Sequence, residues 1–237
     1  MRTKRQQEAQ NKERHRQEQQ AAKARRRGQT SVEPNPLVRA ELPLVLIVCD
    51  GKNTEPDYFG QLRLRFVRVK TVGEGYNTTS LVERAVQLQQ EADYAQVWVV
   101  FDRDSFEPHA FHEAIRLAEK NGFGVAWSNQ SFEYWLILHF EDHQGGGMNR
   151  KQYGHKINGY IVPEGAYYDG EGSKHISADF FTLLESLDPK IRLPRKELAI
   201  RRARRNHDFW LAEGCSMAEA ESCTLVYKLI IALSSYS

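Results

Sequence analysis

Short apolar runs alternate with amphipathic segments through the middle of this chain. The runs are rich in β-branched residues, which is typical of strands covered on both faces, and they lie at residues 44–48, 66–72, 97–101 and 125–127. Segments with helical spacing separate them, at residues 58–65, 79–93 and 111–121. This order predicts an α/β fold with a mainly parallel sheet, flanked by helices and joined by right-handed crossovers.

The pattern weakens after residue 140. Residues 144–150 are rich in glycine and predict a loop, and residues 160–173 combine Gly and Tyr without a clear period. Helical spacing returns at residues 179–187, 194–206 and 218–233. We therefore expect an α/β core at residues 41–143 and a mostly helical C-terminal region at residues 144–237, which packs on the core as a cap and shapes its crevice.

Positive charge gathers in two places. Residues 1–40 form a basic extension, with ten Lys or Arg against four Glu between positions 1 and 33, and its lack of an apolar stripe predicts disorder or a single solvated helix. The expected helix at 194–206 carries six Lys or Arg. Either segment could contact a nucleic acid backbone, and either could be an ordinary solvated surface.

Composition restricts the class of protein. With 237 residues, of which 41% are hydrophobic, the chain can bury one full-sized core and a small addition. No stretch approaches the roughly 20 apolar residues of a membrane span, and the basic N-terminus lacks the apolar centre of a signal peptide, so we expect a cytoplasmic protein without membrane contact. The three cysteines, Cys49, Cys215 and Cys223, lack paired spacing, which argues against a disulfide framework and a structural zinc site.

Two of the predicted strands end in acidic residues. Asp50 and Glu55 follow the run at 44–48, and Asp102 and Asp104 follow the run at 97–101. Because ligands of open α/β sheets bind outside the carboxyl ends of the strands, these acids could share one Mg²⁺. Crowded carboxylates ionise together only when a cation compensates, which favours a metal over an empty acidic pocket. For Asp102 and Asp104 taken alone, a solvated turn is the alternative.

Other residues near these strand ends add to the candidate chemistry. Lys52 could neutralise a phosphate, although neither a P-loop nor a dinucleotide-binding motif is complete here. Ser128 or Asn129 is expected to cap a buried helix that reaches residue 140. Glu133 on that helix needs a partner, which is either the same crevice or a structural arginine. His139 is expected to be a core histidine rather than a base.

Three segments in this order resemble the RloB-like family of bacterial proteins, whose sheet is similar to the Toprim fold of topoisomerases, primases and the overcoming-lysogenization-defect nucleases. They are residues 46–59, 97–104 and 128–140. Toprim enzymes hold Mg²⁺ with an acid after the first strand and an Asp-x-Asp after a later one. The resemblance therefore implies a Toprim-like core with Asp50, Asp102 and Asp104 as ligands of Mg²⁺ or Mn²⁺, and Glu55 as an additional acid.

The resemblance leaves the roles of some residues open. The usual first acid of Toprim enzymes is Glu, so Asp50 departs from the pattern, and its role as ligand or general base is open. Lys174 stands where relatives tend to have a lysine, which makes it a second candidate phosphate contact beside Lys52, with an ordinary surface lysine as the alternative. Glu133 is a candidate for a second metal or for a position behind the ligands.

The function implied is that of a Mg²⁺-dependent nuclease acting on DNA or RNA in bacterial defence or a restriction-associated locus, with a protein partner encoded nearby as a further expectation. One alternative is a non-catalytic subunit that binds nucleic acid or protein and keeps a vestigial acidic site. Another is a phosphoryl-receiving domain with Asp102 as the acceptor. A haloacid-dehalogenase phosphatase is disfavoured because its Asp-x-Asp follows the first strand.

Overall fold

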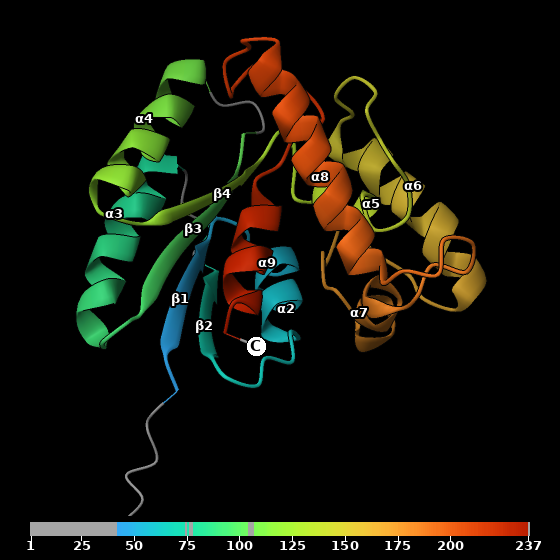
Figure 1. Ribbon diagram of the computed structural model, residues 1–237, viewed down its shortest axis with the longest axis horizontal. Coiled ribbons are helices and arrows are strands. Elements are labelled where there is room, and N and C mark those ends of the chain that lie inside the picture. The colour runs from blue at the N-terminus through green and yellow to red at the C-terminus, as the bar shows by residue number, and fades with distance from the viewer. Residues whose placement is uncertain (1–41, 74, 76–77, 104–106, 237) are drawn as a thin grey trace, which may run out of the picture. The chain divides into compact units, whose positions relative to one another are not determined.

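Four parallel strands form the sheet of this protein, in a computed structural model that describes residues 42–73, 75, 78–103 and 107–236 (Figure 1). The order is β2-β1-β3-β4. The strands are β1 (Leu44–Cys49), β2 (Arg68–Gly73), β3 (Gln96–Asp102) and β4 (Gly124–Ser128). The prediction of an α/β fold with a parallel sheet is thereby confirmed. The basic extension expected at residues 1–40 lies outside the described residues.

Helices cover both faces of the sheet. One face packs against α3 (Thr78–Leu88) and α4 (Pro108–Lys120), and the other packs against α2 (Thr54–Gly60) and α9 (Val226–Ser234) (Figure 1). Because the two central strands are covered on both sides, β1 and β3 are buried over most of their length, which explains their nearly continuous apolar sequences.

The C-terminal part of the chain is mostly helical. It contains α6 (Arg150–Ile161), α7 (Ala178–Glu185) and α8 (Arg195–Ala212), which precede α9. The short helix α5 (Glu133–Ile137) packs against α6 and α8, and α8 also packs against α7 and α9. Leu42–Ser237 form one compact unit. None of the helices in the described part of the chain is long and apolar enough to span a membrane.

The first helix begins earlier than the predicted range of 58–65. It starts at Thr54 and ends at Gly60. Pro56 is compatible with this start, because the N–H groups of a first helical turn have no intrahelical partner. The correction matters for function, since it places Glu55 in the first turn of the helix rather than in a loop.

The predicted helix after the fourth strand is shorter than expected. Regular helix is confined to Glu133–Ile137, and neither candidate cap acts as one. The Ser128 hydroxyl lies 2.9 Å from that of Thr224, and the Asn129 side chain donates to the carbonyl of Ala220. Both polar side chains fix the C-terminal segment beside the sheet instead of ending a helix.

The last helix begins at Val226, not at residue 218 as predicted, because the preceding segment covers an edge of the sheet. The Asn129 N–H donates to the Cys223 carbonyl at 2.8 Å, and the Leu225 N–H donates to the Trp127 carbonyl at 2.8 Å. Exposed backbone groups of an edge strand need partners, and this antiparallel segment provides them at the C-terminal end of β4. Helix α6 was not predicted at all.

Candidate functional site

The order of the strands reverses between β1 and β3. From β1 the chain crosses to β2 on one side, whereas from β3 it crosses to β4 on the other. In open α/β sheets, ligands bind at such a reversal of strand order, outside the carboxyl ends of the two neighbouring strands. Asp50 follows β1 directly and Asp102 is the last residue of β3, so both stand at this point.

The Asp50 carboxylate contacts the backbone of Asp102. The Asp50 carboxylate accepts the N–H of Gly51 through Oδ1 at 2.7 Å and the N–H of Asp102 through Oδ2 at 3.0 Å. Asp102 is itself only 5% exposed. The structure therefore brings together these two predicted residues at the ends of two strands, whereas Asp104 lies outside the described residues.

Glu55 reaches the same strand end from the first turn of α2. The residue is 5% exposed, and its carboxylate packs against the backbone of Gly51 so closely that a Cβ atom at position 51 would overlap it. The Glu55 carboxylate can lie here because residue 51 has no Cβ atom, and Gly51 does not have a positive φ angle. Gly51 thus leaves room for the buried Glu55 carboxylate beside the backbone that follows Asp50.

Glu133 enters the site from α5 and is held by a residue that the sequence did not indicate. The Tyr168 hydroxyl donates to Glu133 Oε1 at 2.8 Å and lies 3.1 Å from the Thr54 hydroxyl. Burial, followed by the charge of Glu133, raises the pKa of Tyr168, so the phenol stays protonated and acts as a donor. Tyr168 therefore links α5 to the first turn of α2.

The pKa values of groups next to the site reflect its concentration of negative charge. Burial raises the pKa of the Cys49 thiol, and the charges of Glu55, Asp50 and Asp102 raise it further, in that order. Burial also raises the pKa of Tyr153 to about 12, with Glu133 as the first of its acidic neighbours. Cys49 is therefore a buried, protonated residue rather than a reactive thiolate.

The two candidate phosphate contacts border the site differently. Lys52 is exposed, and its side chain lies against Gly75, in the loop after β2. Lys174 adopts a left-handed backbone with φ of 54°, and its carbonyl accepts the Thr54 hydroxyl at 2.9 Å. Its backbone is thus tied to the start of α2, and the phosphate role of both lysines stays a prediction.

His139 is a core residue. It is fully buried, its Nδ1 lies 3.0 Å from the Trp135 carbonyl, and its Nε2 lies 3.4 Å from the Tyr58 hydroxyl. Burial is the main cause that lowers its pKa to about 3. A ring that is neutral and enclosed by aromatic side chains has a structural role, as the sequence indicated.

The donor chemistry of the site fits a hard divalent cation. Its carboxylates offer only oxygen ligands, and Mg²⁺ is commonly held by one or two carboxylates while water and substrate phosphates fill the other positions. Among the described residues, no three His, Cys, Asp or Glu side chains form a group that could hold an ion by themselves. Asp50 and Asp102 would therefore hold it together with Asp104 or with oxygens of a substrate.

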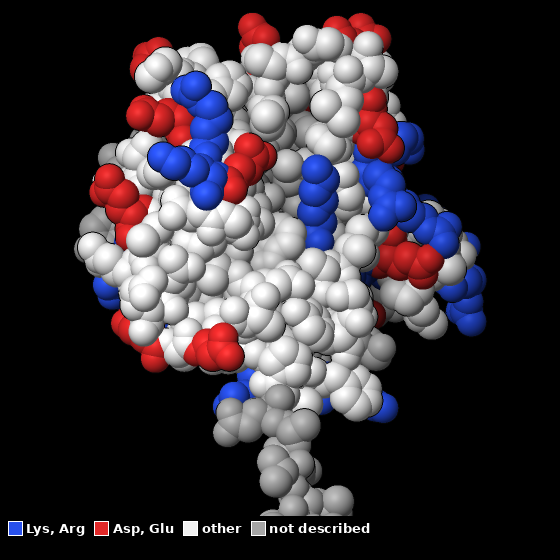
Figure 2. Space-filling view, turned by 60° about the vertical axis from the view of Figure 1, so that its left-hand side comes forward, with Lys and Arg blue, Asp and Glu red and all other residues white. Residues whose placement is uncertain are grey.

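The basic helix α8 does not present its charges as one surface. Four of its cationic side chains pair with carboxylates of the protein: Arg195 with Asp188, Lys196 with Glu185, Arg201 with Glu197, and Arg205 with Asp142. Arg202 donates to the Leu138 carbonyl at 2.7 Å. Figure 2 likewise shows basic side chains next to acidic ones on one face of the described residues. These contacts favour a structural role for the basic residues of α8.

Sequence patterns did not indicate Tyr168, Thr54 or Tyr153 as members of the site. Tyr168 lies in the segment without periodicity, 114 residues from Thr54. The positions of Tyr168 and Tyr153 depend on how the C-terminal part of the chain packs against α2 and α5, which motifs at strand ends do not show. Thr54 lies within the segment 46–59, where no pattern distinguishes it.

Comparison with known proteins assigns the family. The curated proteins and the solved structures yield no match to this chain. The family described as RloB-like protein matches residues 45–233, which include all of the sheet except Leu44, the acidic strand ends and most of the C-terminal helices. The chain therefore belongs to the RloB-like protein family.

Proposed function

We propose that this protein is a nuclease that depends on Mg²⁺ or Mn²⁺ and hydrolyses phosphodiester bonds of DNA or RNA in the cytoplasm. The proposal rests on one observation: the Asp50 carboxylate accepts the backbone N–H of Asp102 at the reversal of strand order, where ligands of such sheets bind. The buried carboxylates of Glu55 and Glu133 support it, because they enter the same region from two helices.

The roles of the residues follow from their positions. Asp102 and Asp104 would be ligands of the ion, and Asp50 a ligand or the general base that accepts a proton from the attacking water. When bound, such an ion stabilises charge on the attacking and leaving oxygens. Glu55 would support these ligands, and Lys52 and Lys174 would contact phosphates. Glu133, held by Tyr168, would lie behind the ligands or contribute to a second ion.

Family membership also motivates a biological proposal. We propose that the protein acts in bacterial defence or from a restriction-associated locus, together with a protein encoded nearby. A nuclease that is harmful to its own cell would require such control.

Cleavage assays with Asp102→Ala test the activity. Wild-type protein with Mg²⁺ or Mn²⁺ should cleave at least one of single-stranded DNA, duplex DNA and RNA, and chelation of the ion should stop cleavage. Asp102→Ala should lose at least about a hundred-fold in rate, because stabilisation of transition-state charge by an ion contributes several kcal/mol. Asp208→Asn removes a carboxylate that is 65% exposed on α8 and serves as the control. Equal rates for Asp102→Ala and wild type would refute the assignment.

A non-catalytic binding subunit is the second candidate. It is favoured by the engagement of the Asp50 carboxylate with two backbone N–H groups, which leaves fewer lone pairs for an ion. Binding of nucleic acid or protein that persists without metal, combined with no cleavage under any condition, would select this candidate.

A further inference from the structure

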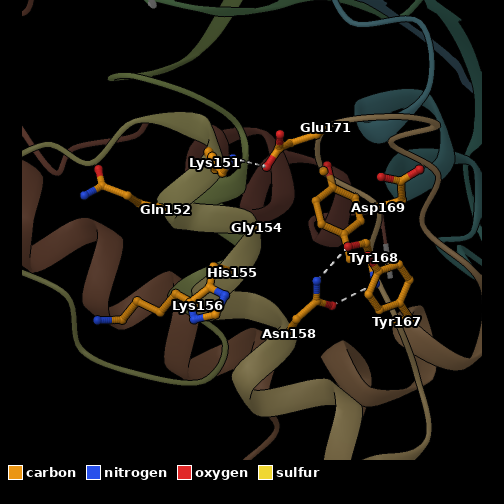
Figure 3. Close-up of a pocket in the computed structure, with 11 residues that line it drawn as sticks. Lys151, Gln152, Gly154, His155, Lys156, Asn158, Tyr167, Tyr168, Asp169 and Glu171 are labelled. Carbon is orange, nitrogen blue, oxygen red and sulfur yellow. Dashed lines mark hydrogen bonds and ion pairs between the residues drawn. The ribbon is translucent and has the colours of Figure 1, made fainter.

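A pocket lies beside the acidic site, between α6 and the segment 167–171 (Figure 3). Its volume of about 730 Å³ is within the range of small-molecule and nucleotide sites. Tyr168 forms part of its wall, and the hydroxyl of the same residue donates to Glu133. Tyr168 is therefore a wall shared by the pocket and the acidic site.

The walls of the pocket are fixed by specific contacts. The Asn158 side chain donates to the Tyr168 carbonyl at 2.8 Å and accepts the Tyr168 N–H at 2.9 Å. Gly154 of α6 faces Gly170, and a Cβ atom on Gly154 would lie 3.7 Å from the Cα atom of Gly170. The loop is thus held closely against the helix, and the pocket is formed before any ligand arrives.

The charges around the pocket balance one another. Lys151 pairs with Glu171 at 3.4 Å, as Figure 3 shows, and Lys156 pairs with Glu141 at 2.7 Å. The Asp169 carboxylate accepts the N–H groups of Gly172 and Ser173 in its own loop. Because its charged side chains already have partners within the protein, the pocket suits an uncharged ligand group better than a phosphate.

Two aromatic residues of the wall remain available for such a group. Tyr167 is 66% exposed, and neither its hydroxyl nor the ring of His155 has a hydrogen-bond or ion-pair partner in the described parts of the chain. Exposed aromatic rings bind unstacked bases by stacking, and this is possible only for bases that are not inside a duplex.

We propose that this pocket binds an unpaired base of single-stranded nucleic acid, adjacent to the phosphate that the acidic site would cleave. The proposal rests on the proposed nuclease function for the position of that phosphate. Tyr167 supplies the stacking surface, His155 supplies a polar contact to the base edge, and Tyr168 separates the base from the carboxylates. The substrate class is therefore single-stranded DNA or RNA, or an unpaired region of a folded one.

Binding of fluorescein-labelled oligonucleotides of mixed sequence tests this proposal. Fluorescence anisotropy with the full chain in EDTA compares single-stranded DNA, single-stranded RNA and their duplexes. Wild type should bind a single strand more tightly than the duplex, and the DNA and RNA arms identify the preferred sugar. Tyr167→Ala should weaken single-strand binding between about five- and a hundred-fold, which is the range for the loss of one stacked base. Tyr167→Phe should bind within about two-fold of wild type, because stacking needs the ring and not the hydroxyl.

Phe209→Ala is the matched control, since Phe209 is an aromatic residue on α8 that is 55% exposed and outside the pocket. His155→Ala is a second pocket variant and should also weaken binding. The proposal is overturned if Tyr167→Ala binds as Phe209→Ala does, or if wild type prefers the duplex or binds no single strand.

The outcome separates the pocket from the nuclease. Weaker binding by Tyr167→Ala with no cleavage by wild type would support the pocket and refute the nuclease. Unchanged binding and KM in Tyr167→Ala, with an inactive Asp102→Ala, would support the nuclease and refute the pocket.

Discussion

Glu55 is buried at the end of β1 because residue 51 has no side chain. A Cβ atom at position 51 would overlap the Glu55 carboxylate. The carboxylate is the far end of a flexible side chain, so a larger residue at position 51 would move it rather than break the strand. The position of the Glu55 carboxylate therefore depends on the absence of a methyl group at position 51.

We predict that Gly51→Ala lowers activity without unfolding the protein. Displacement of Glu55 should reduce the cleavage rate by about ten-fold or more, because small misplacements of groups near a reacting centre have effects of that size. Gly60→Ala is the matched control, since a Cβ atom there meets no atom within 4 Å and alanine favours a helix. Rates and thermal unfolding of both variants would be measured. Full activity of Gly51→Ala would show that catalysis does not depend on the observed position of the Glu55 carboxylate.

Residues at strand ends could be anticipated from the sequence, whereas their supports could not. Asp50 and Asp102 each follow an apolar run, and the end of a strand fixes where its next residue lies. The position of Tyr168 could not be anticipated in this way, because it depends on the loop after α6 and on the Asn158 side chain. The catalytic roles of the acids stay predictions until cleavage is measured.

At the scale of elements, α8 acts as a connector. Its residues contact the loop at Asp188, the end of α5 and the segment near Asp142. Arg202 is half-buried, and burial lowers its pKa, although the guanidinium stays charged. Its hydrogen bond to the Leu138 carbonyl joins α8 to the segment that carries Glu133.

We predict that Arg202→Ala destabilises the fold more than Arg201→Ala does. The first change leaves a carbonyl in the interior without its donor, which costs about 1–3 kcal/mol. Arg201 forms an exposed pair with Glu197 one helical turn away, and such pairs contribute about 0.3–0.5 kcal/mol. Urea unfolding of both variants would give the two free energies. Equal effects would mean that the Leu138 contact contributes nothing.

Sequence patterns identified some elements well and missed others for physical reasons. The strands β1 and β3 were readily predicted because burial on both faces requires continuous apolar runs. Helix α6 was missed although its start carries a capping box, in which Asn149 and Gln152 each accept the backbone N–H of the other. The predicted start of the last helix was wrong because residues 218–221 have helical composition, whereas residues 223–225 pair with the end of β4 and precede the helix.

For the whole molecule, a buried histidine makes stability depend on pH. The Trp135 carbonyl can only accept a hydrogen bond, so Nδ1 of His139 carries the proton of the neutral ring and Nε2 faces the Tyr58 hydroxyl. Protonation of Nε2 would place a charge in an aromatic interior without an acidic partner among the described residues. The folded state therefore keeps the pKa of His139 at about 3, whereas in the unfolded chain it has its ordinary value of about 6.5.

The sign of the effect follows from this difference. Above about pH 6.5 the ring is neutral in both states, and it contributes no pH dependence. As the pH falls below that value, only the unfolded chain binds the proton, so the free energy of unfolding should fall by up to about 1.4 kcal/mol per pH unit until the pKa of the folded state is reached.

We predict that urea unfolding between about pH 5 and pH 7 shows this slope in wild type and a smaller one in His139→Gln. His207, whose pKa burial also lowers, is present in both proteins, so its contribution cancels in the difference. Parallel curves for the two proteins would show that His139 has the same pKa in the folded and unfolded states, and the enclosed aromatic environment described for it would then be wrong.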